Sequence, residues 1–517
     1  MRFFKAFFGM VALTAFLFPQ VASANVTKGP WLLNLSKRGV TIKWEAAQLT
    51  CDFKWGDSPS FSESRTVPSS LGVFETTLEC LRPDTTYYYQ ISCGTDSTPI
   101  KQVRTGIEND EPFQFVVYGD TRSNKVEHQS VVDAIENEVP HFVIHTGDLV
   151  DVAIWAPEWE DFWDVESDLL ETTAIFPVMG NHEFWGGQGF FKRYFGNPLA
   201  PGSDYSQYAF RYGNSYFIFV DIAKLHIVGT PQYNWFADQL KKASEAPGIE
   251  HCFVTAHFPV YSASNHGEDL DVVSHRNAMQ PLLEQYGIDM HYGGHDHNYQ
   301  HSRVNGIDYI VAGGGGADQY GVDPQPWTVV GEKTLSYAVV EVSGTQVTFT
   351  AKRPDGSVIE SFTLDRDFGP GNGDPIPELC EDYDYDGDTL TDGAEYASCT
   401  NPYEADSDGD TFDDNVELDA GTDPCDGNDY PNAPDDDDVA DDDGATDDDD
   451  ATVDDDDSDD DDTDDDDLTD DDDLDDDDLS DDDDAVDDDA VSDDDDQVDD
   501  DDSGISGDDD DDSSGCG

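Results

Sequence analysis

From Phe113 to about residue 365 the chain alternates short apolar runs with stretches of helical periodicity. The run FQFVVYGD at Phe113 precedes a helical pattern through Val131 and Ile135, and HFVIHTGD follows at His141. Alternation of strand and helix over a segment this long predicts an α/β domain built in layers. This pattern restricts the fold more than any other feature of the chain.

Some later apolar runs follow one another without a helix between them. They are SYFIFVD at Ser215, IDYIVAGG at Ile307 and SYAVVEV at Ser336. Because parallel neighbours need a long crossover connection, we expect part of the sheet to be antiparallel.

The segment before this domain has a different pattern. Short runs such as VTIKW at Val40, FKWG at Phe53 and YYYQIS at Tyr87 alternate apolar and polar positions. We therefore expect a small all-β antiparallel sandwich over residues 25–107, an α/β domain over 108–366 and a Pro- and Gly-rich linker over 367–379.

Five motifs bring polar residues to the ends of apolar strands. They are YGDTR with Asp120, HTGDLVD with Asp148, MGNHE with Asn181 and His182, TAHFPVYS with His257, and GGHDHNYQ with His295 and His297. The carboxyl ends of strands in an open α/β sheet meet at one edge, so we expect these side chains to converge. Carboxylates, an amide oxygen and imidazoles are ligands for Fe, Mn and Zn, and the motifs predict a site for two such ions.

Here a family resemblance becomes specific. The ordered motifs GD, GDxxD, GNHE, His257 after its strand, and GHDH resemble those of the calcineurin-like metallophosphoesterases. The string LRPDTTYYYQIS resembles the fibronectin type III modules in front of the catalytic domain of purple acid phosphatase relatives. The resemblance covers roughly residues 26 to 365 and implies a layered α/β/β/α sandwich.

The resemblance also implies a ligand set for the two ions. The first metal would take Asp120, Asp148 and His297, and the second would take Asp148, Asn181, His257 and His295. Asp148 would bridge the ions. The identity of each ion, Fe, Mn or Zn, stays open.

Two positions depart from the family pattern. Purple acid phosphatases have a metal-bound tyrosine three residues after the bridging aspartate, and this chain has Asp151 there, so we expect a colourless protein with Asp151 as a weak ligand candidate. Many members carry a histidine where this chain has Arg122. Arg122 is a candidate for binding a phosphate oxygen, with a structural ion pair as the alternative.

Two further histidines are candidates for contact with substrate. His182 is expected to face the phosphate and to assist the leaving group or stabilise charge in the transition state, as in the family. An ordinary surface histidine beside Glu183 is the alternative. His266, in the loop SASNHGEDLD, is a second candidate, for which an ordinary loop histidine is the alternative.

The expected function is that of a phosphoesterase with Asp148 and His182 as the catalytic residues. A hydroxide bridging the two ions would attack phosphorus, as in other binuclear sites. A small phosphomonoester is the expected substrate. A phosphodiesterase or nucleotidase on the same site is one alternative, and a calcium-dependent surface protein with an inactive phosphatase-like domain is another.

Residues 380–430 contain an internal repeat of 22 residues. Each unit places acidic residues with the spacing of a twelve-residue calcium loop. The glycine falls at position 4 rather than 6, so the units resemble thrombospondin type 3 repeats more than EF-hands. The expected calcium ligands are Asp384, Asp386, Asp388, Asp392 and Glu395 in the first unit, and Asp406, Asp408, Asp410, Asp414 and Glu417 in the second.

The rest of the chain, residues 431–517, is dominated by Asp. From Asp435 onward 51 of 83 residues are Asp, which leaves −92 + 51 = −41 of the formal net charge for the rest. Such a segment has too few apolar residues to fold, so we expect a disordered acidic tail. The charge argues against nucleic acid as a partner and favours calcium ions. Protein partners cannot be read from it.

The first 24 residues have the pattern of a secretory signal peptide, with two cations, a short apolar stretch and Ala22-Ser23-Ala24. We expect export to the periplasm, the cell surface or the medium. No later stretch is long and apolar enough for a transmembrane helix. Eight cysteines are compatible with disulfides whose pairing the spacing leaves open, and Cys252 is expected to be a buried thiol.

Overall fold

The computed structural model describes residues 26–108, 111–196, 206–222, 224, 227–365, 368, 384, 387–396, 400, 405–427 and 429–431. The predicted signal peptide, almost all of the linker and all but the first residue of the predicted acidic tail lie outside these residues.

One sheet has nine strands within the described residues, in the order β21-β20-β19-β9-β10-β11-β1-β2-β5. They span β1 Val26–Ser36, β2 Gly39–Ala46, β5 Val73–Leu78, β9 Phe113–Tyr118, β10 Phe142–His145, β11 Ala174–Pro177, β19 Tyr337–Ser343, β20 Gln346–Lys352 and β21 Val358–Asp365. Strands β9, β10 and β11 are parallel, and β19 is antiparallel to β9. The expected mixture of parallel and antiparallel pairing is confirmed.

A second sheet has seven described strands in the order β12-β13-β14-β15-β17-β16-β18. They span β12 Tyr208–Tyr212, β13 Ser215–Val220, β14 His251–Ala256, β15 Met290–Gly293, β16 Tyr299–Val304, β17 Ile307–Ala312 and β18 Thr328–Glu332. Here β13, β14, β15 and β17 are parallel, while β12 and β16 are antiparallel to their neighbours.

Eight helices lie within the described residues. They are α1 Lys125–Glu136, α2 Ala156–Leu170, α3 Asn181–Gly186, α4 Gly189–Phe195, α5 Pro231–Glu245, α6 Leu270–Tyr286, α7 Asp392–Tyr396 and α8 Asp414–Ala420. The helix predicted through Val131 and Ile135 is α1, which Asn124 caps by accepting the N–H of Glu127 at 3.3 Å. Within the described part of the chain, none of these helices has both the length and the apolar character needed to span a membrane.

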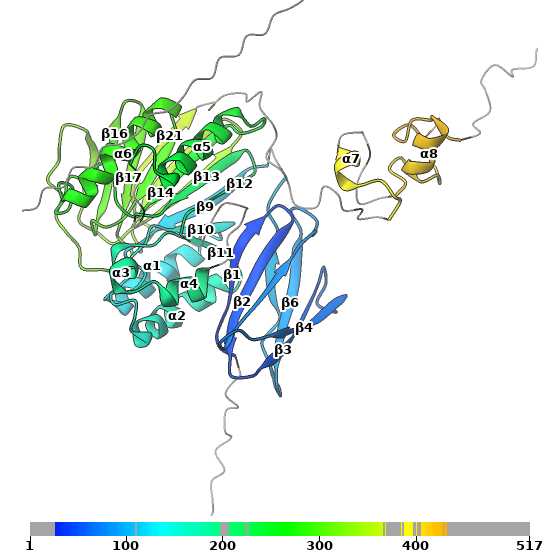
Figure 1. Ribbon diagram of the computed structural model, residues 1–517, viewed down its shortest axis with the longest axis horizontal. Helices are drawn as coiled ribbons and strands as arrows, with labels where there is room; N and C mark the ends of the chain where they lie inside the picture. The colour runs from blue at the N-terminus through cyan, green and yellow to red at the C-terminus, as the bar shows by residue number, and fades with distance from the viewer. Residues whose placement is uncertain are drawn as a thin grey trace, which may run out of the picture. The chain divides into compact units, whose positions relative to one another are not determined.

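The two sheets pack face to face around aromatic side chains. The ring of Phe115 on β9 lies 5.2 Å from that of Phe217 and 5.4 Å from that of Phe253, both on the second sheet. On the outer faces, α1 and α2 cover the first sheet, and α5 and α6 cover the second (Figure 1). The layers are therefore helices, sheet, sheet and helices, and the mixed α/β part of the predicted fold is confirmed.

The N-terminal segment is rich in strands, as expected, and three of its strands are continuous with the first sheet of the α/β layers. Strands β1, β2 and β5 continue the nine-stranded sheet, because β1 pairs in parallel with β11 at Leu32 and Ala174. The remaining strands form a separate small sheet against them: β3 Thr50–Gly56, β4 Glu63–Pro68, β6 Thr86–Cys93, β7 Asp96–Ser97 and β8 Lys101–Arg104. Pairing β1 with β11 covers an edge that each strand would otherwise expose.

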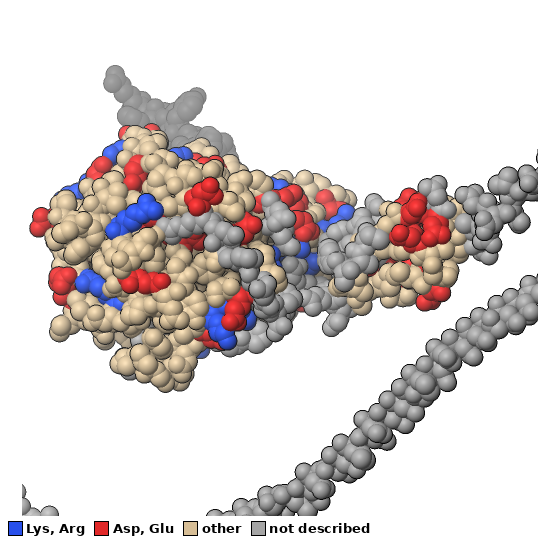
Figure 2. Space-filling model, turned by 90° about the horizontal axis from the view of Figure 1, so that it is seen from above, with Lys and Arg blue, Asp and Glu red and all other residues tan. Residues whose placement is uncertain are grey.

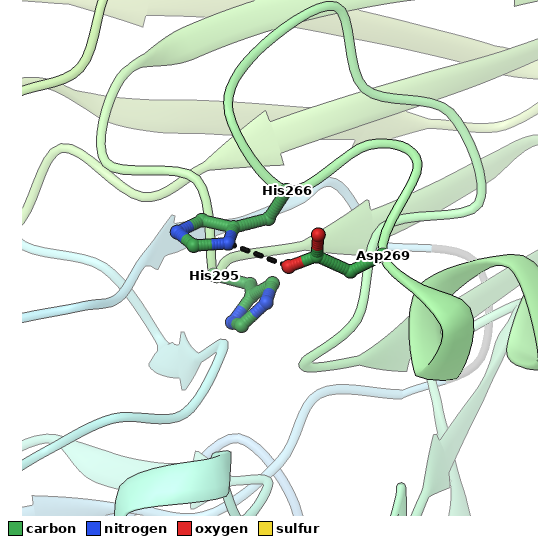
Figure 3. Close-up of side chains that lie close together, drawn as sticks. All are labelled: His266, Asp269 and His295. Atoms are coloured by element: carbon green, nitrogen blue, oxygen red, sulfur yellow. Dashed lines mark hydrogen bonds and ion pairs between the residues drawn. The ribbon is translucent and has the colours of Figure 1, made fainter. Parts of the chain in front are cut away.

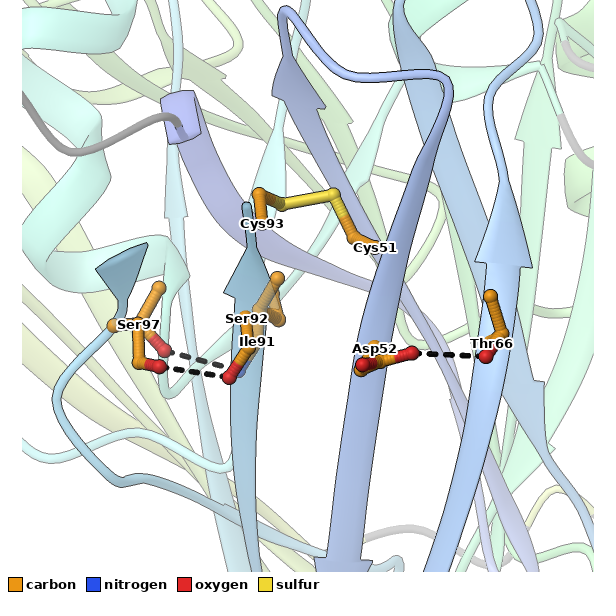
Figure 4. The surroundings of a disulfide bond; sticks show 8 residues. Cys51, Asp52, Thr66, Ile91, Ser92, Cys93 and Ser97 are labelled. Atoms are coloured by element: carbon orange, nitrogen blue, oxygen red, sulfur yellow. Dashed lines mark hydrogen bonds between the residues drawn. A yellow bond between two sulfur atoms is a disulfide. The ribbon is translucent and has the colours of Figure 1, made fainter. Parts of the chain in front are cut away.

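A disulfide joins neighbouring strands of the small sheet. It links Cys51 on β3 to Cys93 on β6 (Figure 4). Beside it, the Thr66 hydroxyl donates to Asp52 at 2.8 Å. Cys252 is the free cysteine of the described residues, and it is buried as predicted.

Candidate functional site

The polar motifs lie where five strands of the two sheets end. Asp120 follows β9, Asp148 follows β10 and Asn181 follows β11 at the first residue of α3. His257 directly follows β14, and His295 follows β15. Ligand atoms of three of these residues, Asp120, Asp148 and His257, all lie within 4.8 Å of one another.

The backbone bends sharply at these strand ends. Asp120, Asp148 and His295 have φ values of 57°, 53° and 70°, in the left-handed region that non-glycine residues seldom adopt. Such strain persists where the surroundings enforce it, and it is often found at functional sites.

Two glycines make room for the carboxylates. A Cβ built on Gly180 would lie 2.0 Å from Oδ1 of Asp148, and one built on Gly294 would lie 2.3 Å from Oδ2 of Asp120. Both contacts are far below van der Waals distance. The glycines of the GNHE and GHDH motifs are therefore required by the carboxylates packed against them.

Asp148 is fully buried and has contacts on both oxygens. Its Oδ1 accepts the backbone N–H of His182 at 3.1 Å and lies 3.4 Å from Nε2 of His257. Its Oδ2 lies 3.3 Å from Nε of Arg122. Burial raises the pKa of Asp148, but interactions with His257, His182 and Arg122 outweigh it, so the pKa lies below its usual value.

Asp120 is the second buried carboxylate. Both of its oxygens accept the backbone N–H of His295 at 3.0 Å, and Oδ1 lies 3.6 Å from Nε2 of His297. Burial, followed by the charge of Asp148, raises the pKa of Asp120 well above its usual range. Two adjacent carboxylates cannot both ionise in such a place unless positive charge lies between them.

The hydrogen bonds of the His257 ring indicate whether a cation fits between the predicted ligands. Its Nδ1–H donates to the carbonyl of Thr146 at 2.8 Å, and burial lowers its pKa, so Nε2 carries a lone pair. That nitrogen faces Oδ1 of Asn181 at 3.0 Å as well as Asp148. Nε2 of His257 and the Oδ1 atoms of Asn181 and Asp148 therefore face one another with lone pairs and without a hydrogen atom between them. A metal ion bound there would accept all three lone pairs.

His297 has the same arrangement of its ring. Its Nδ1–H donates to the carbonyl of Asp318 at 2.8 Å, which leaves Nε2 to accept from Nη2 of Arg122 at 3.3 Å. Burial and the charge of Arg122 lower the pKa of His297 to about 4. Burial and nearby His257 lower the pKa of His295 to about 2. Neutral imidazoles are the form that binds a metal ion, so the donor set fits a binuclear site.

Glu183 is a site residue that the sequence reasoning passed over. It is fully buried and accepts the backbone N–H groups of Asp148 at 3.0 Å, Val150 at 3.1 Å and Gly180 at 2.9 Å. Burial and the charge of Asp148 raise its pKa to about 8. It joins the loop of Asp148 to the start of α3. Its position in the GNHE motif is the sequence feature that marks it as a site residue.

Arg122 and Asp151 pair with each other at the mouth of the site. Nη1 of Arg122 lies 2.6 Å from Oδ1 of Asp151, and its Nε faces Asp148. Among the described residues, Asp151 is not part of a group close enough to share one ion. The backbone carbonyl of Asp151 accepts Nδ1–H of His182 at 2.6 Å, which turns Nε2 of His182 to within 3.8 Å of Asp148.

His266 lies beside His295, with ring centroids 4.7 Å apart. Its Nδ1 is hydrogen-bonded to Asp269 at 2.8 Å (Figure 3). Its backbone N–H donates to Asp296 at 3.1 Å. The loop histidine is thus held at the site, next to a predicted ligand.

Tyr320 is a second residue that was missed. Its ring stacks on His297 at 4.3 Å and lies 5.5 Å from the ring of His266. Its backbone N–H donates to the carbonyl of His297 at 2.8 Å. No motif in the sequence marks Tyr320, because it comes from the loop between β17 and β18.

Four other histidines have buried or packing contacts with neighbouring residues. His128 contacts Glu166 at 2.7 Å and His301 contacts Asp308 at 2.8 Å. His145 lies against the hydroxyl of Thr121 at 3.1 Å. The ring of the fourth, His141, packs against Phe113.

The two acidic repeats share a loop geometry. In the first, Asp384 accepts the N–H groups of Gly387 at 2.7 Å and Thr389 at 3.0 Å. In the second, Asp406 accepts those of Gly409 and Thr411, both at 2.8 Å. All four donors have positive φ. Asp386 and the side chain of Asp392 lie outside the described residues, while the side chains of Asp388 and Glu395 are buried.

The second repeat gathers carboxylates around Glu417 on α8. Asp406, Asp408 and Asp410 have ligand atoms within 4.8 Å of one another. Glu417 is fully buried and neither of its oxygens has a hydrogen-bond partner. Burial and the charges of Asp410 and Asp408 raise its pKa to about 7. Asp414, in contrast, accepts from the backbone and hydroxyl of Ser407.

Acidic side chains also gather on the surface of the segment that carries α8 (Figure 2). On the visible face of the larger part, acidic and basic residues are interspersed.

Residues 113–299 match the family model of calcineurin-like phosphoesterases. The chain is 24% identical over 237 residues to purple acid phosphatase 5 of Arabidopsis thaliana, covering 44% of this chain and 55% of that protein. It is 24% identical over 320 residues to purple acid phosphatase 1 of Ipomoea batatas, covering 56% and 66%. A shorter match, 34% over 89 residues, joins 17% of this chain to 25% of tartrate-resistant acid phosphatase type 5 of Rattus norvegicus. The chain thus spans less than two thirds of each of these relatives.

Two solved structures have a similar fold. Purple acid phosphatase PPD1 from yellow lupin superposes with a TM-score of 0.58 at 17% identity, covering 68% of this chain and 78% of that one. PhoD superposes with a TM-score of 0.53 at 12% identity, covering 70% and 96%. At these identities the likeness concerns the fold alone.

Proposed function

We propose that this chain hydrolyses phosphate esters, from the premise that its residues 113–299 form a calcineurin-like metallophosphoesterase domain similar to that of purple acid phosphatases. The observation that carries the proposal is the unprotonated Nε2 of His257 facing the oxygens of Asn181 and Asp148. A cation between these groups would satisfy all of them.

In this proposal Asp120, Asp148 and His297 hold one ion, and Asp148, Asn181, His257 and His295 hold the other. Two bound ions of Fe, Mn or Zn would lower the pKa of water and neutralise charge on the phosphoryl group. Asp151 is not needed as a ligand, because its carboxylate pairs with Arg122.

The protein side chains around the ions have distinct parts. Arg122 presents a guanidinium at the mouth and binds a phosphoryl oxygen by exchanging its contact with Asp151. His182, held by the carbonyl of Asp151, directs Nε2 into the site, where its protonated form donates to the leaving oxygen. His266 lies beside His295 and contacts the substrate from the opposite loop.

A phosphomonoester is the proposed substrate, because the relatives named above are acid phosphatases. The same two ions also suit a diester, and comparing hydrolysis of phenyl phosphate with that of diphenyl phosphate distinguishes the two alternatives.

On the pattern of residues 1–24 we also propose export to the periplasm, the cell surface or the medium.

Replacing the bridging carboxylate tests the site. Asp148→Ala is expected to lose bound transition metal, measured by inductively coupled plasma mass spectrometry, together with nearly all hydrolysis of phenyl phosphate. Asp355→Ala, in the exposed turn between β20 and β21, is the matched control and should keep both. Full metal content and unchanged turnover in Asp148→Ala would remove the basis of the proposal. A wild-type protein that binds two metal ions but hydrolyses neither ester would favour the inactive surface protein.

A second function is favoured by Glu417. We propose that the second repeat binds calcium through Asp406, Asp408, Asp410 and Glu417, and that the first repeat binds a further ion in the same way. The two unpartnered oxygens of buried Glu417 support this, because buried carboxylates need a cation or a donor.

Proteolysis tests this proposal. No Lys or Arg follows Arg366, so trypsin does not cleave this segment. Chymotrypsin cleavage after Phe412 should be suppressed by calcium, and equal cleavage with and without calcium would contradict the proposal.

A further inference from the structure

Four apolar side chains are exposed in the segments that follow the site residues Asp151 and His182. Their exposed fractions are 38% for Val152, 69% for Ile154, 56% for Trp155 and 77% for Trp185. We call this group the apolar rim. Exposed apolar residues that gather beside a reactive site mark a place where a ligand binds.

Trp185 shares a helix face with the site. Helix α3 begins at Asn181, and Trp185 follows it by four residues and His182 by three. Residues at these spacings lie on one face, about 5.4 Å apart along the axis for a full turn. Glu183 points the other way and is fully buried. The indole therefore lies one turn from the two polar side chains at the start of α3.

The other three members of the apolar rim come from the loop after Asp151. The carbonyl of Asp151 accepts Nδ1–H of His182 at 2.6 Å, which fixes the start of this loop against α3. At the far end of α3, a Cβ built on Gly187 would lie 2.6 Å from Cγ2 of Ile154. The loop therefore runs along α3 over its whole length, and Ile154 lies against the chain just after Trp185.

From this placement we infer that the apolar rim binds the leaving group of the substrate and that Trp185 selects aryl phosphates. The inference rests on the proposed function and names the substrate class of that same site. None of the four side chains carries a charge, so they suit an uncharged group, while Arg122 and the metal ligands face the phosphate. An aromatic ring bonded directly to the ester oxygen stays within about one helical turn of phosphorus, and Trp185 follows the ligand candidate Asn181 by about one turn of α3. Flat rings stack favourably on an indole, and small alkyl groups do not.

Two substrates distinguish binding of the aromatic ring by Trp185 from a general effect of Trp185 on activity. Phenyl phosphate carries the ring, and glycerol 2-phosphate does not. In the full chain, Trp185→Ala is expected to raise KM for phenyl phosphate about 5- to 10-fold with little change in kcat, because the ring contact is equal in ground and transition states. KM for glycerol 2-phosphate should not change. Trp185→Phe should restore KM for phenyl phosphate, since it keeps an aromatic face.

Leu49→Ala is the matched control, because Leu49 is 83% exposed and lies in the turn between β2 and β3. It should leave both substrates unaffected. Unchanged KM for phenyl phosphate in Trp185→Ala, or an equal rise for both substrates, would overturn the inference while the proposed function stands. If the wild-type chain hydrolyses neither ester, the proposed function fails first and the inference fails with it.

Discussion

Asp148 is packed so closely that one added methyl group would displace it. The nearest backbone is that of Gly180, whose φ of −89° is open to any residue. The glycine is therefore required for space and not for conformation. This distinguishes it from Gly147, which has a φ of 99° in addition to close contacts.

Gly180→Ala is accordingly expected to keep its fold and to lose function. A Cβ 2.0 Å from Oδ1 and 2.4 Å from the backbone nitrogen of Asp148 must push this residue out of place, and a displacement of about 1 Å at a reactive site can cost about 100-fold in rate. We expect kcat/KM for phenyl phosphate to fall by about that factor, with lower metal content and an unchanged circular dichroism spectrum. Gly189→Ala is the control, because a Cβ there meets nothing within 4 Å. Equal activity of the two variants would contradict this account of Gly180.

Among the elements, helix α8 has a stability that depends on the negative charge of the loops around it. Glu417 lies within its seven residues and is buried among carboxylates, which raises its pKa from 4.5 to about 7. A carboxyl whose folded pKa is raised favours the folded state below its unfolded pKa, and this stability is lost as pH rises through the folded pKa. Without calcium, the second repeat should therefore be most ordered near pH 4 and lose order between about pH 4.5 and 7.

Chymotrypsin digestion in EDTA measures this. Cleavage after Phe412 is expected to be slow at pH 5 and fast at pH 8, once corrected for the enzyme's own pH dependence with a denatured substrate. Calcium should suppress cleavage at pH 8, because the ion replaces the proton on Glu417. In Glu417→Gln the difference between the two pH values in EDTA should shrink, and a full difference in that variant would show that another group is responsible.

The loop of the first repeat also contacts α8. Asp388 accepts the backbone N–H of Asn415 at 3.2 Å, and the Asn415 amide donates to Thr389 at 2.9 Å. Order in the loop of the first repeat therefore affects the stability of the start of α8 in the second repeat.

At the scale of the whole molecule, the N-terminal strands and the α/β layers share one core. Strand β1 joins the nine-stranded sheet at β11, and Trp44 belongs to the same apolar cluster as Phe115 and Phe253. Removing the first segment would expose the edge of β11 and part of that cluster. We therefore expect a cut at the predicted boundary, between residues 107 and 108, to destabilise the α/β layers.

A chain that begins at residue 108 is thus expected to aggregate or to lose its cooperative thermal unfolding transition. A chain that ends at Asp365, after β21, is the control and should keep that transition, its metal and its hydrolysis of phenyl phosphate. Size-exclusion chromatography and calorimetry compare them. A monomeric, metal-binding protein from residue 108 onward would show that the shared sheet is dispensable.

The alternating apolar and helical patterns were enough to predict the elements of the α/β layers and the polar residues at the strand ends. Periodicity and residue type are local properties, so Asp120, Asp148, Asn181, His257, His295 and His297 could be named, and the general rule for strand ends predicted that they meet. The register of the acidic repeats was readable for the same reason.

The remaining features follow from how segments distant in the sequence pack against one another. The pairing of β1 with β11 joins residues more than a hundred positions apart, and nothing local distinguishes an edge that another strand will cover. Glu183 and Tyr320 matter because of what packs against them, and Asp151 proved to face Arg122 because of the fold around both. Such contacts depend on distances between segments, which residue type and spacing do not contain.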